Sequence, residues 1–147
     1  IGPARAMRDA GARLALGSDS HAVIDLFEEA RAVELDERPA TNVRGHHDAA
    51  SLLRAASEGG HASIGWPEAG RIEVGALADF VSVRLDSVRT AGTDDQSALE
   101  AAVFAAAAAD VHHVVVGGRT VVSDGAHATM DVAESLQTSI ARVWAGA

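Results

Sequence analysis

The sequence predicts an α/β fold followed by a β-rich part, and three observations lead to this prediction. A short apolar run at residues 13–16 ends abruptly and is followed by helical spacing of apolar residues. After Trp66, glycine and proline separate short runs that are rich in β-branched residues. Residues 131–144 carry apolar side chains on one side, as an amphipathic helix does. We place a domain boundary near Trp66, which divides the chain into residues 1–66 and 67–147.

The first part alternates between helix and strand signals. The predicted helices cover residues 3–10, 22–38 and 49–56, and the predicted strand is a buried one at residues 13–16. Pro39 is expected to end the second helix, because proline disrupts a helix interior. Asp48 is the expected N-cap of the third helix, and the Gly59-Gly60 pair is expected to end it.

The second part combines short strands with two helices. The predicted strands cover residues 71–74 and 79–85, and residues 112–116 and 119–122 are expected to form a hairpin across Gly117-Gly118. The predicted helices are an alanine-rich one, capped by Asp94 or Asp95 and reaching about Ala109, and the amphipathic one at residues 131–144.

Composition narrows the class of protein. The chain has 147 residues, of which 48% are hydrophobic, and a formal net charge of -9 from 12 basic and 21 acidic residues. Nucleic acid is not an expected partner, because phosphate binding needs clustered basic side chains. The chain has no cysteine, so any metal ion must be held by His, Asp or Glu. No apolar run approaches the length of a membrane span. We expect a cytoplasmic protein, and the first residue, Ile1, suggests a piece of a longer chain.

Two interpretations of Asp19 are open from position and spacing alone. In the first, Ser18, Asp19 or Ser20 caps the helix that follows. In the second, Asp19 follows a buried parallel strand and faces the mouth of a (β/α) barrel, where such folds place their active-site residues. The two are compatible, because Ser20 can cap the helix while Asp19 points into the mouth.

The seven histidines provide few candidate metal ligands. His112 and His113 are neighbours in a predicted strand, so we expect their side chains on opposite faces and unable to share an ion. Four others have no metal-binding spacing: His46, His47, His61 and His127. His21 remains a candidate site residue, because it lies two residues from Asp19.

Four segments resemble the C-terminal portion of metal-dependent amidohydrolases: LALGSDSH, ASLLRAASEGGHASIGW, AGRIEVGALADFVSVRLDS and VVVGGRTVVSDG. In that superfamily, the pattern I-x-x-G-x-x-A-D followed by apolar residues leads from the barrel to a small β-sandwich. Ile72, Gly75, Ala78 and Asp79 match it here. The resemblance implies the last strand and helices of a (β/α)8 TIM-type barrel, strands of the amidohydrolase β-sandwich, and a C-terminal helix.

Within the superfamily, the chain most resembles the formimidoylglutamate deiminases of histidine degradation. The segments that carry this resemblance are residues 17–21, 25–31, 65–66 and 87–92. It implies hydrolysis of N-formimino-L-glutamate to N-formyl-L-glutamate and ammonia. Deaminases of guanine, cytosine or triazines rank second, since they usually have threonine before the aspartate and lack the histidine after it.

The resemblance also implies roles for two residues. Asp19 corresponds to the catalytic aspartate that binds one divalent metal ion, expected to be zinc, and accepts the proton of the attacking water. His21 is a candidate substrate-binding neighbour of the metal. The family's other ligands would lie before Ile1, so we expect this chain alone to be inactive.

Expected partners follow from the same resemblance. They are a small-molecule substrate, the remainder of the barrel or another chain that completes it, and a second copy in a homodimer of the full-length protein. We expect the helices of the first part to expose apolar faces until such a partner covers them. A non-catalytic module, in which the SDSH turn is only a helix cap, remains an alternative.

Overall fold

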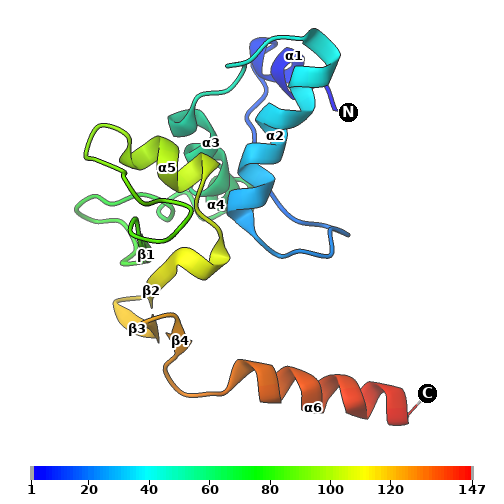
Figure 1. The fold of residues 1–147 in the computed structure, drawn as a ribbon, viewed down its shortest axis with the longest axis vertical. Coiled ribbons are helices and arrows are strands. Elements are labelled where there is room, and N and C mark those ends of the chain that lie inside the picture. The colour runs from blue at the N-terminus through cyan, green and yellow to red at the C-terminus, as the bar shows by residue number, and fades with distance from the viewer. Residues whose placement is uncertain (1, 147) are drawn as a thin grey trace.

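The computed structural model describes residues 2–146. The helices are α1 (Ala4–Asp9), α2 (Leu26–Thr41), α3 (Ala49–Ala56), α4 (Glu58–Ser63), α5 (Ala98–Phe104) and α6 (Val132–Ala145), with a 3-10 turn η1 (Ala108–Asp110). The strands are β1 (Phe80–Val83), β2 (Val111–Val116), β3 (Arg119–Ser123) and β4 (Ala126–His127). Helices α1 to α5 gather in one body, and α6 extends away from it beyond the sheet (Figure 1).

The apolar core lies between α2, α3 and α5. Its buried members are Ala30, Ala49, Leu52 and Val103, and Leu16, Val33 and Phe104 pack against them. Val103 and Phe104 come from residues 67–147, whereas the other core residues come from residues 1–66. The two parts of the chain therefore share one core.

Helix α2 begins and ends later than the predicted 22–38. The Asp25 carboxylate accepts a hydrogen bond from the Phe27 N–H and caps the helix, and Asn42 ends it in the left-handed region at φ 57°. The expectation that Pro39 ends this helix was wrong. The last turn continues past Pro39 because the Asn42 N–H donates to the Arg38 carbonyl at 2.7 Å.

Helix α3 confirms the predicted helix at residues 49–56, with the Asp48 carboxylate accepting from the Ser51 N–H at 2.6 Å. The expectation that Gly59-Gly60 ends it was wrong. The break is at Ser57, and both glycines lie inside α4. A Cβ at position 59 would lie 2.6 Å from the Leu14 carbonyl oxygen, so glycine allows α4 to pack directly against that backbone.

Two predicted strands, at residues 13–16 and 71–74, are not strands in the structure. A strand needs a neighbour whose backbone groups complete its ladder. Within residues 2–146 the sheet contains only β1 to β4, so neither segment has a partner. Residues 13–16 still show the alternation of a strand, because Leu14 and Leu16 are half-buried between exposed neighbours.

The four strands form one antiparallel sheet in the order β1-β2-β3-β4. Strand β1 confirms the centre of the strand predicted at residues 79–85. The predicted hairpin is also confirmed: β2 and β3 are joined by Gly117 and Gly118, at φ 55° and 75°. Two consecutive positive φ angles are what a tight two-residue hairpin turn requires.

The alanine-rich helix predicted to reach Ala109 is shorter. Asp94 accepts a hydrogen bond from the Ser97 N–H at 2.9 Å, and α5 begins only at Ala98 and ends at Phe104. After it, Ala107 has extended backbone angles of φ -136° and ψ 173°. The helix stops because the carboxylates of Asp110 and Asp25 accept hydrogen bonds from the N–H groups of Ala107 and Ala108.

Helix α6 confirms the predicted C-terminal helix, and the Asp131 carboxylate caps it. Its apolar side chains are exposed, with Leu136, Ile140 and Val143 at 56%, 54% and 69%. The accessible surface of the whole chain is 9909 Å². A compact monomer of 15.1 kDa would expose about 7,100 Å². The chain is therefore less compact than such a monomer, and large apolar side chains are among those it exposes.

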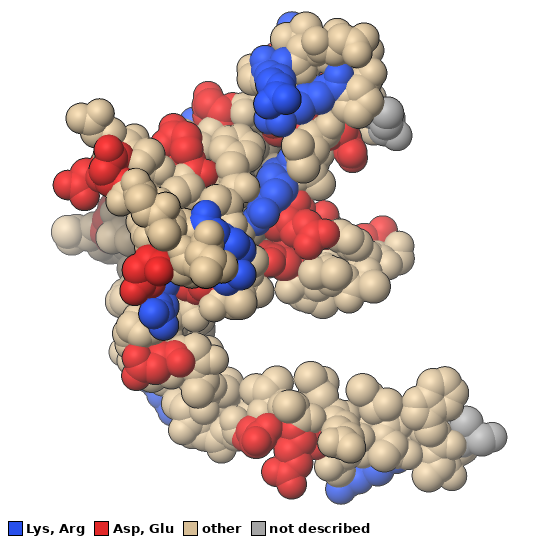
Figure 2. Space-filling model, viewed as in Figure 1, with Lys and Arg blue, Asp and Glu red and all other residues tan. Residues whose placement is uncertain are grey.

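The surface charge and the helix composition describe the exterior of the chain. Arginines lie between acidic side chains on the face shown in Figure 2, and most of α6 carries neither. Among residues 2–146, no helix has both the length and the apolar composition to cross a bilayer.

Candidate functional site

Asp19 lies in a tight, exposed turn between the 13–16 segment and α2. The His21 N–H donates to the Ser18 carbonyl at 2.7 Å, which closes the turn around Asp19. Asp19 has φ 45°, a region that aspartate tolerates better than most residues. Asp19 is exposed, and within residues 2–146 no hydrogen bond or ion pair involves its carboxylate.

Packing holds the segment before the turn in place. Leu16 packs against the helical core, and the backbone of Leu14 lies against Gly59 in α4. Two residues of the segment are therefore fixed by contacts with helices, and these contacts hold the start of the turn that follows.

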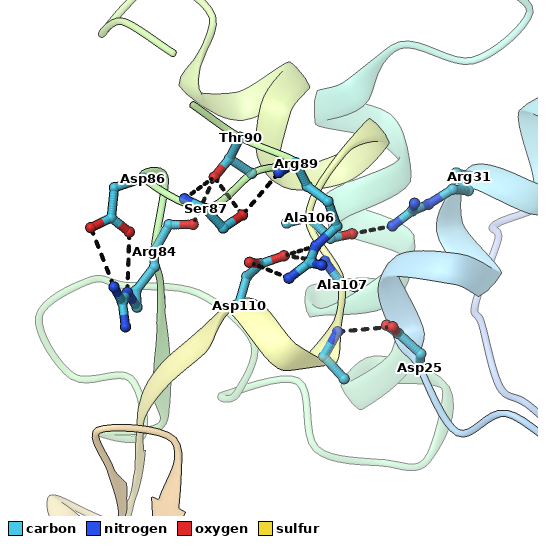
Figure 3. Close-up of polar contacts among 11 residues, drawn as sticks. Asp25, Arg31, Arg84, Asp86, Ser87, Arg89, Thr90, Ala106, Ala107 and Asp110 are labelled. Atoms are coloured by element: carbon cyan, nitrogen blue, oxygen red, sulfur yellow. Dashed lines mark hydrogen bonds and ion pairs between the residues drawn. The ribbon is translucent and has the colours of Figure 1, made fainter. Parts of the chain in front are cut away.

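The segment after the turn is fixed by Asp25. One carboxylate oxygen accepts from the Phe27 N–H at 2.9 Å, and the other accepts from the Ala108 N–H at 2.9 Å. The side chain of Arg31 in α2 donates to the Ala106 carbonyl, in the same segment after α5 (Figure 3). These contacts join the start of α2 to the segment that leads into the sheet.

The sequence interpretation missed this function of Asp25. Asp25 was not among the predicted caps or core residues, whereas it is 9% exposed. The interpretation in which Ser18, Asp19 or Ser20 caps the helix was wrong, because Asp25 is the cap. The signal was present, because an Asp followed three residues later by Glu28 has the spacing of a capping box.

A second buried carboxylate fixes the other side of this segment. Asp110, 2% exposed, receives two hydrogen bonds of 2.8 Å from the Arg89 guanidinium and one of 2.8 Å from the Ala107 N–H (Figure 3). The bonds from Arg89 hold the pKa of Asp110 well below its ordinary value. Asp25 and Asp110 thus bind adjacent backbone N–H groups, which explains why α5 does not continue to Ala109.

His21, the other candidate, is bound to α2. Its Nδ1 lies 2.7 Å from a Glu29 carboxylate oxygen, and its Nε2 lies 3.6 Å from one of Glu28. The hydrogen bond with Glu29 raises the pKa of His21. His21 is therefore close to Asp19 in the chain, but its ring is held by the acidic first turn of α2.

The described residues do not by themselves complete a catalytic zinc site. Such a site needs three protein ligands and an open position. Within residues 2–146, Asp19 belongs to no group of three or more His, Asp or Glu side chains that could share a metal ion. A metal at Asp19 would require ligands from outside this chain.

His47 belongs to a polar cluster beside α2 that is built on the buried Glu34, while the His46 ring contacts Arg5 and Thr41. The Glu34 carboxylate accepts from the N–H groups of Gly45 and His47 at 2.8 Å each and from the Arg38 guanidinium at 2.9 Å. Burial by itself raises the pKa of Glu34, but these donors outweigh burial and lower it to about 2. Burial also lowers the pKa of His47. The cluster fixes the loop between α2 and α3.

The expectation that His112 and His113 point to opposite faces was wrong. Their ring centroids are 4.1 Å apart, and with Asp124 they form the one group within residues 2–146 whose ligand atoms could share a metal ion. The register of β1 against β2 shifts at this point, so the alternation of a regular strand is interrupted there.

Comparison with known proteins places the chain in a family. The model of the amidohydrolase family matches residues 1–121. Curated relatives include the 5-methylthioadenosine/S-adenosylhomocysteine deaminases of Natronomonas pharaonis, 31% identical over 134 residues, and Bacillus thuringiensis, 31% identical over 139 residues. Each alignment covers 89% of this chain, but only 30% and 31% of the relative.

Two solved enzyme structures resemble this chain over nearly all of its length. An adenosine deaminase from Xanthomonas campestris with bound zinc superposes on 99% of this chain and 33% of its own, with TM-score 0.85 and 31% identity. Atrazine chlorohydrolase from Arthrobacter aurescens with zinc covers 96% of this chain and 32% of its own, with TM-score 0.80 and 27% identity. The chain spans about one third of the length of these proteins. Because the family model matches most of the sequence, this chain belongs to the amidohydrolase family.

Proposed function

We propose that this chain is the C-terminal part of a metal-dependent hydrolase that removes ammonia from N-formimino-L-glutamate and leaves N-formyl-L-glutamate. The observation that carries the proposal is the Asp19 carboxylate. It lies in an exposed turn after a supported segment and, within residues 2–146, forms no structural hydrogen bond. A carboxylate used as a helix cap would not be free in this way, and Asp25 performs that role instead.

In this proposal Asp19 has two tasks. It binds a divalent metal ion, with zinc favoured by the solved relatives that contain it, together with ligands from a part of the protein outside this chain. It also accepts a proton from the attacking water and donates it to the departing nitrogen. One water is consumed, the carbon–nitrogen bond of the formimino group breaks, and one ammonia leaves.

The substrate rests on the sequence resemblance of the SDSH turn and of the helix that follows it. His21 is proposed to contact the substrate, since it adjoins Asp19 and its neighbour Glu29 favours the charged imidazolium. Deamination of 5-methylthioadenosine or S-adenosylhomocysteine is the second candidate, because the curated relatives carry that name.

The remaining proposals concern the whole protein. Residues 1–66 would complete a (β/α)8 barrel supplied by the rest of the chain or by a partner, and residues 67–147 would contribute strands to a β-sandwich. The exposed apolar residues of α2 and α6 would be covered in that assembly or in a homodimer. A cytoplasmic location fits an enzyme that acts on a soluble metabolite.

The test uses the full-length protein and measures ammonia release from formiminoglutamate, 5-methylthioadenosine, S-adenosylhomocysteine and adenosine. Formiminoglutamate should have the highest kcat/KM. In Asp19→Asn, kcat should fall at least about 100-fold, the loss expected when a positioned acid–base group is removed, and the bound zinc should decrease. Asp36→Asn, at an exposed carboxylate on α2, is the matched control. Full activity in Asp19→Asn would refute the role of Asp19, and preference for a purine would refute the substrate.

A further inference from the structure

We propose that His112, His113 and Asp124 bind a divalent transition-metal ion on the surface of the β-sheet. The three side chains come from β2 and from the turn between β3 and β4. Each offers one ligand atom, and these atoms all lie within 4.8 Å of one another. The site shares no residue with the turn that contains Asp19, so it does not depend on the proposed deaminase function.

An irregularity in the sheet brings the two histidines together. Ser82 of β1 pairs with His113, but the next residue, Val83, pairs with Val111. His112 is therefore the extra residue of a β-bulge, which rotates its side chain away from the position that strand alternation would give it. The rings meet edge to face, at 71° between their planes.

The turn after β3 supplies the third ligand. Asp124 has φ 52°, a conformation that most residues avoid, and the Gly125 N–H donates to the His112 carbonyl at 3.0 Å. This backbone bond holds the turn beside β2. The Asp124 carboxylate lies 2.7 Å from His112 Nε2. The carboxylate and the imidazole are therefore already adjacent before any ion binds.

The ring of His113 is oriented by Ser82. His113 Nδ1 lies 3.2 Å from the Ser82 hydroxyl, and the His113 N–H donates to the same oxygen at 3.0 Å. A hydrogen bond on one ring nitrogen fixes the orientation in which the other nitrogen faces a metal. Because Nδ1 contacts Ser82, Nε2 is the ring nitrogen of His113 without a hydrogen bond to Ser82.

The chemistry of the three donors selects the class of ion. Two imidazole nitrogens and one carboxylate oxygen suit Zn²⁺, Cu²⁺ or Ni²⁺ better than Ca²⁺ or Mg²⁺, which prefer oxygen ligands. Three protein ligands leave one tetrahedral position for water or another group. Arg84, which follows β1, forms an ion pair with Asp86 at 3.1 Å, and Asp124 is near enough to help raise the pKa of Arg84.

The test measures zinc stoichiometry in the full-length protein after dialysis against buffered Zn²⁺. The variants His112→Gln, His113→Gln and Asp124→Asn should each bind one equivalent of zinc less than the wild-type protein. His127→Gln removes a histidine from β4, outside the cluster, and should keep the wild-type number. Circular dichroism and the melting temperature identify which variants keep the native fold. Asparagine is chosen at position 124 because it tolerates positive φ.

A second measurement needs no variant. Diethyl pyrocarbonate modifies accessible imidazoles, and mass spectrometry of peptides locates the modified residues. Zn²⁺ should lower the rate at which His112 and His113 are modified severalfold. His127 should be modified at the same rate with and without Zn²⁺. The proposal is overturned if the cluster variants bind as much zinc as the wild type, if His127→Gln loses the same equivalent, or if Zn²⁺ gives no selective protection.

Discussion

The Asp25 carboxylate accepts a hydrogen bond from the Ala108 N–H at 2.9 Å, although the two residues are 83 positions apart in the sequence. The same carboxylate caps α2. One side chain therefore begins the helix after the Asp19 turn and connects it to the segment that leads into the sheet. The position of the turn depends on this contact.

Asp25→Ala should lower the free energy of unfolding by about 2 to 4 kcal/mol. The change removes an N-cap and leaves the Ala108 N–H without its charged acceptor. Urea denaturation of the protein that contains this chain measures the loss. Asp36→Ala, at an exposed carboxylate on the same helix, should change stability by less than about 0.5 kcal/mol. Equal effects of the two variants would contradict the role of Asp25.

Glu34 should make stability dependent on acidic pH. Its pKa is 4.5 in the unfolded chain and about 2 in the folded one, so its contribution is complete above about pH 4.5. As the pH falls from there toward 2, the unfolded state takes up the proton first and stability is lost. A difference of this size corresponds to a free energy on the order of 3 kcal/mol.

Glu34→Gln should therefore be less stable at pH 7, and its stability should vary less between pH 4.5 and 2. Urea denaturation at several pH values compares it with the exposed Glu100→Gln, which should retain the wild-type profile. A Glu34→Gln profile parallel to that of the wild type would show that other carboxylates cause the acid dependence.

Glu29→Gln should lower the pKa of His21. The Glu29 carboxylate lies 2.7 Å from His21 Nδ1 and favours the protonated ring, a preference that a neutral amide does not share. Titration of the His21 ring signals by NMR gives the pKa directly. Glu28→Gln should have the smaller effect, because Glu28 is 3.6 Å from the ring. The reverse order would mean that the ring turns toward Glu28 in solution.

Two adjacent glycines in α4 should respond oppositely to alanine. Gly60→Ala should stabilise the protein by about 0.5 to 1 kcal/mol, since alanine favours a helix and the nearest atom to the new Cβ is 3.6 Å away. Gly59→Ala should destabilise it by about 1 to 3 kcal/mol, because its Cβ would lie 2.6 Å from the Leu14 carbonyl oxygen. Thermal denaturation of both variants decides this, and a stabilised Gly59→Ala would disprove the close backbone contact.

Local signals predicted several elements well. The Asp48 cap and the helix at residues 49–56, the Gly117-Gly118 hairpin, and the helix after Asp131 all agree with the structure. In each, a cap, a turn or an apolar periodicity within a few residues specifies the conformation. The membership in the amidohydrolase family was also readable from short segments.

Tertiary structure decided the rest, because the deciding contacts are distant in sequence. The 13–16 segment has the alternation of a strand but no neighbour to pair with. The end of α5 depends on Asp25 and Asp110, which bind the backbone that follows it. The pairing of His112 with His113 depends on a bulge opposite Ser82, and strand periodicity alone predicts the reverse. The sequence by itself determined local conformation and family, whereas only the fold decided which polar groups meet, since a hydrogen bond or a shared ion requires two segments to be placed within a few ångströms.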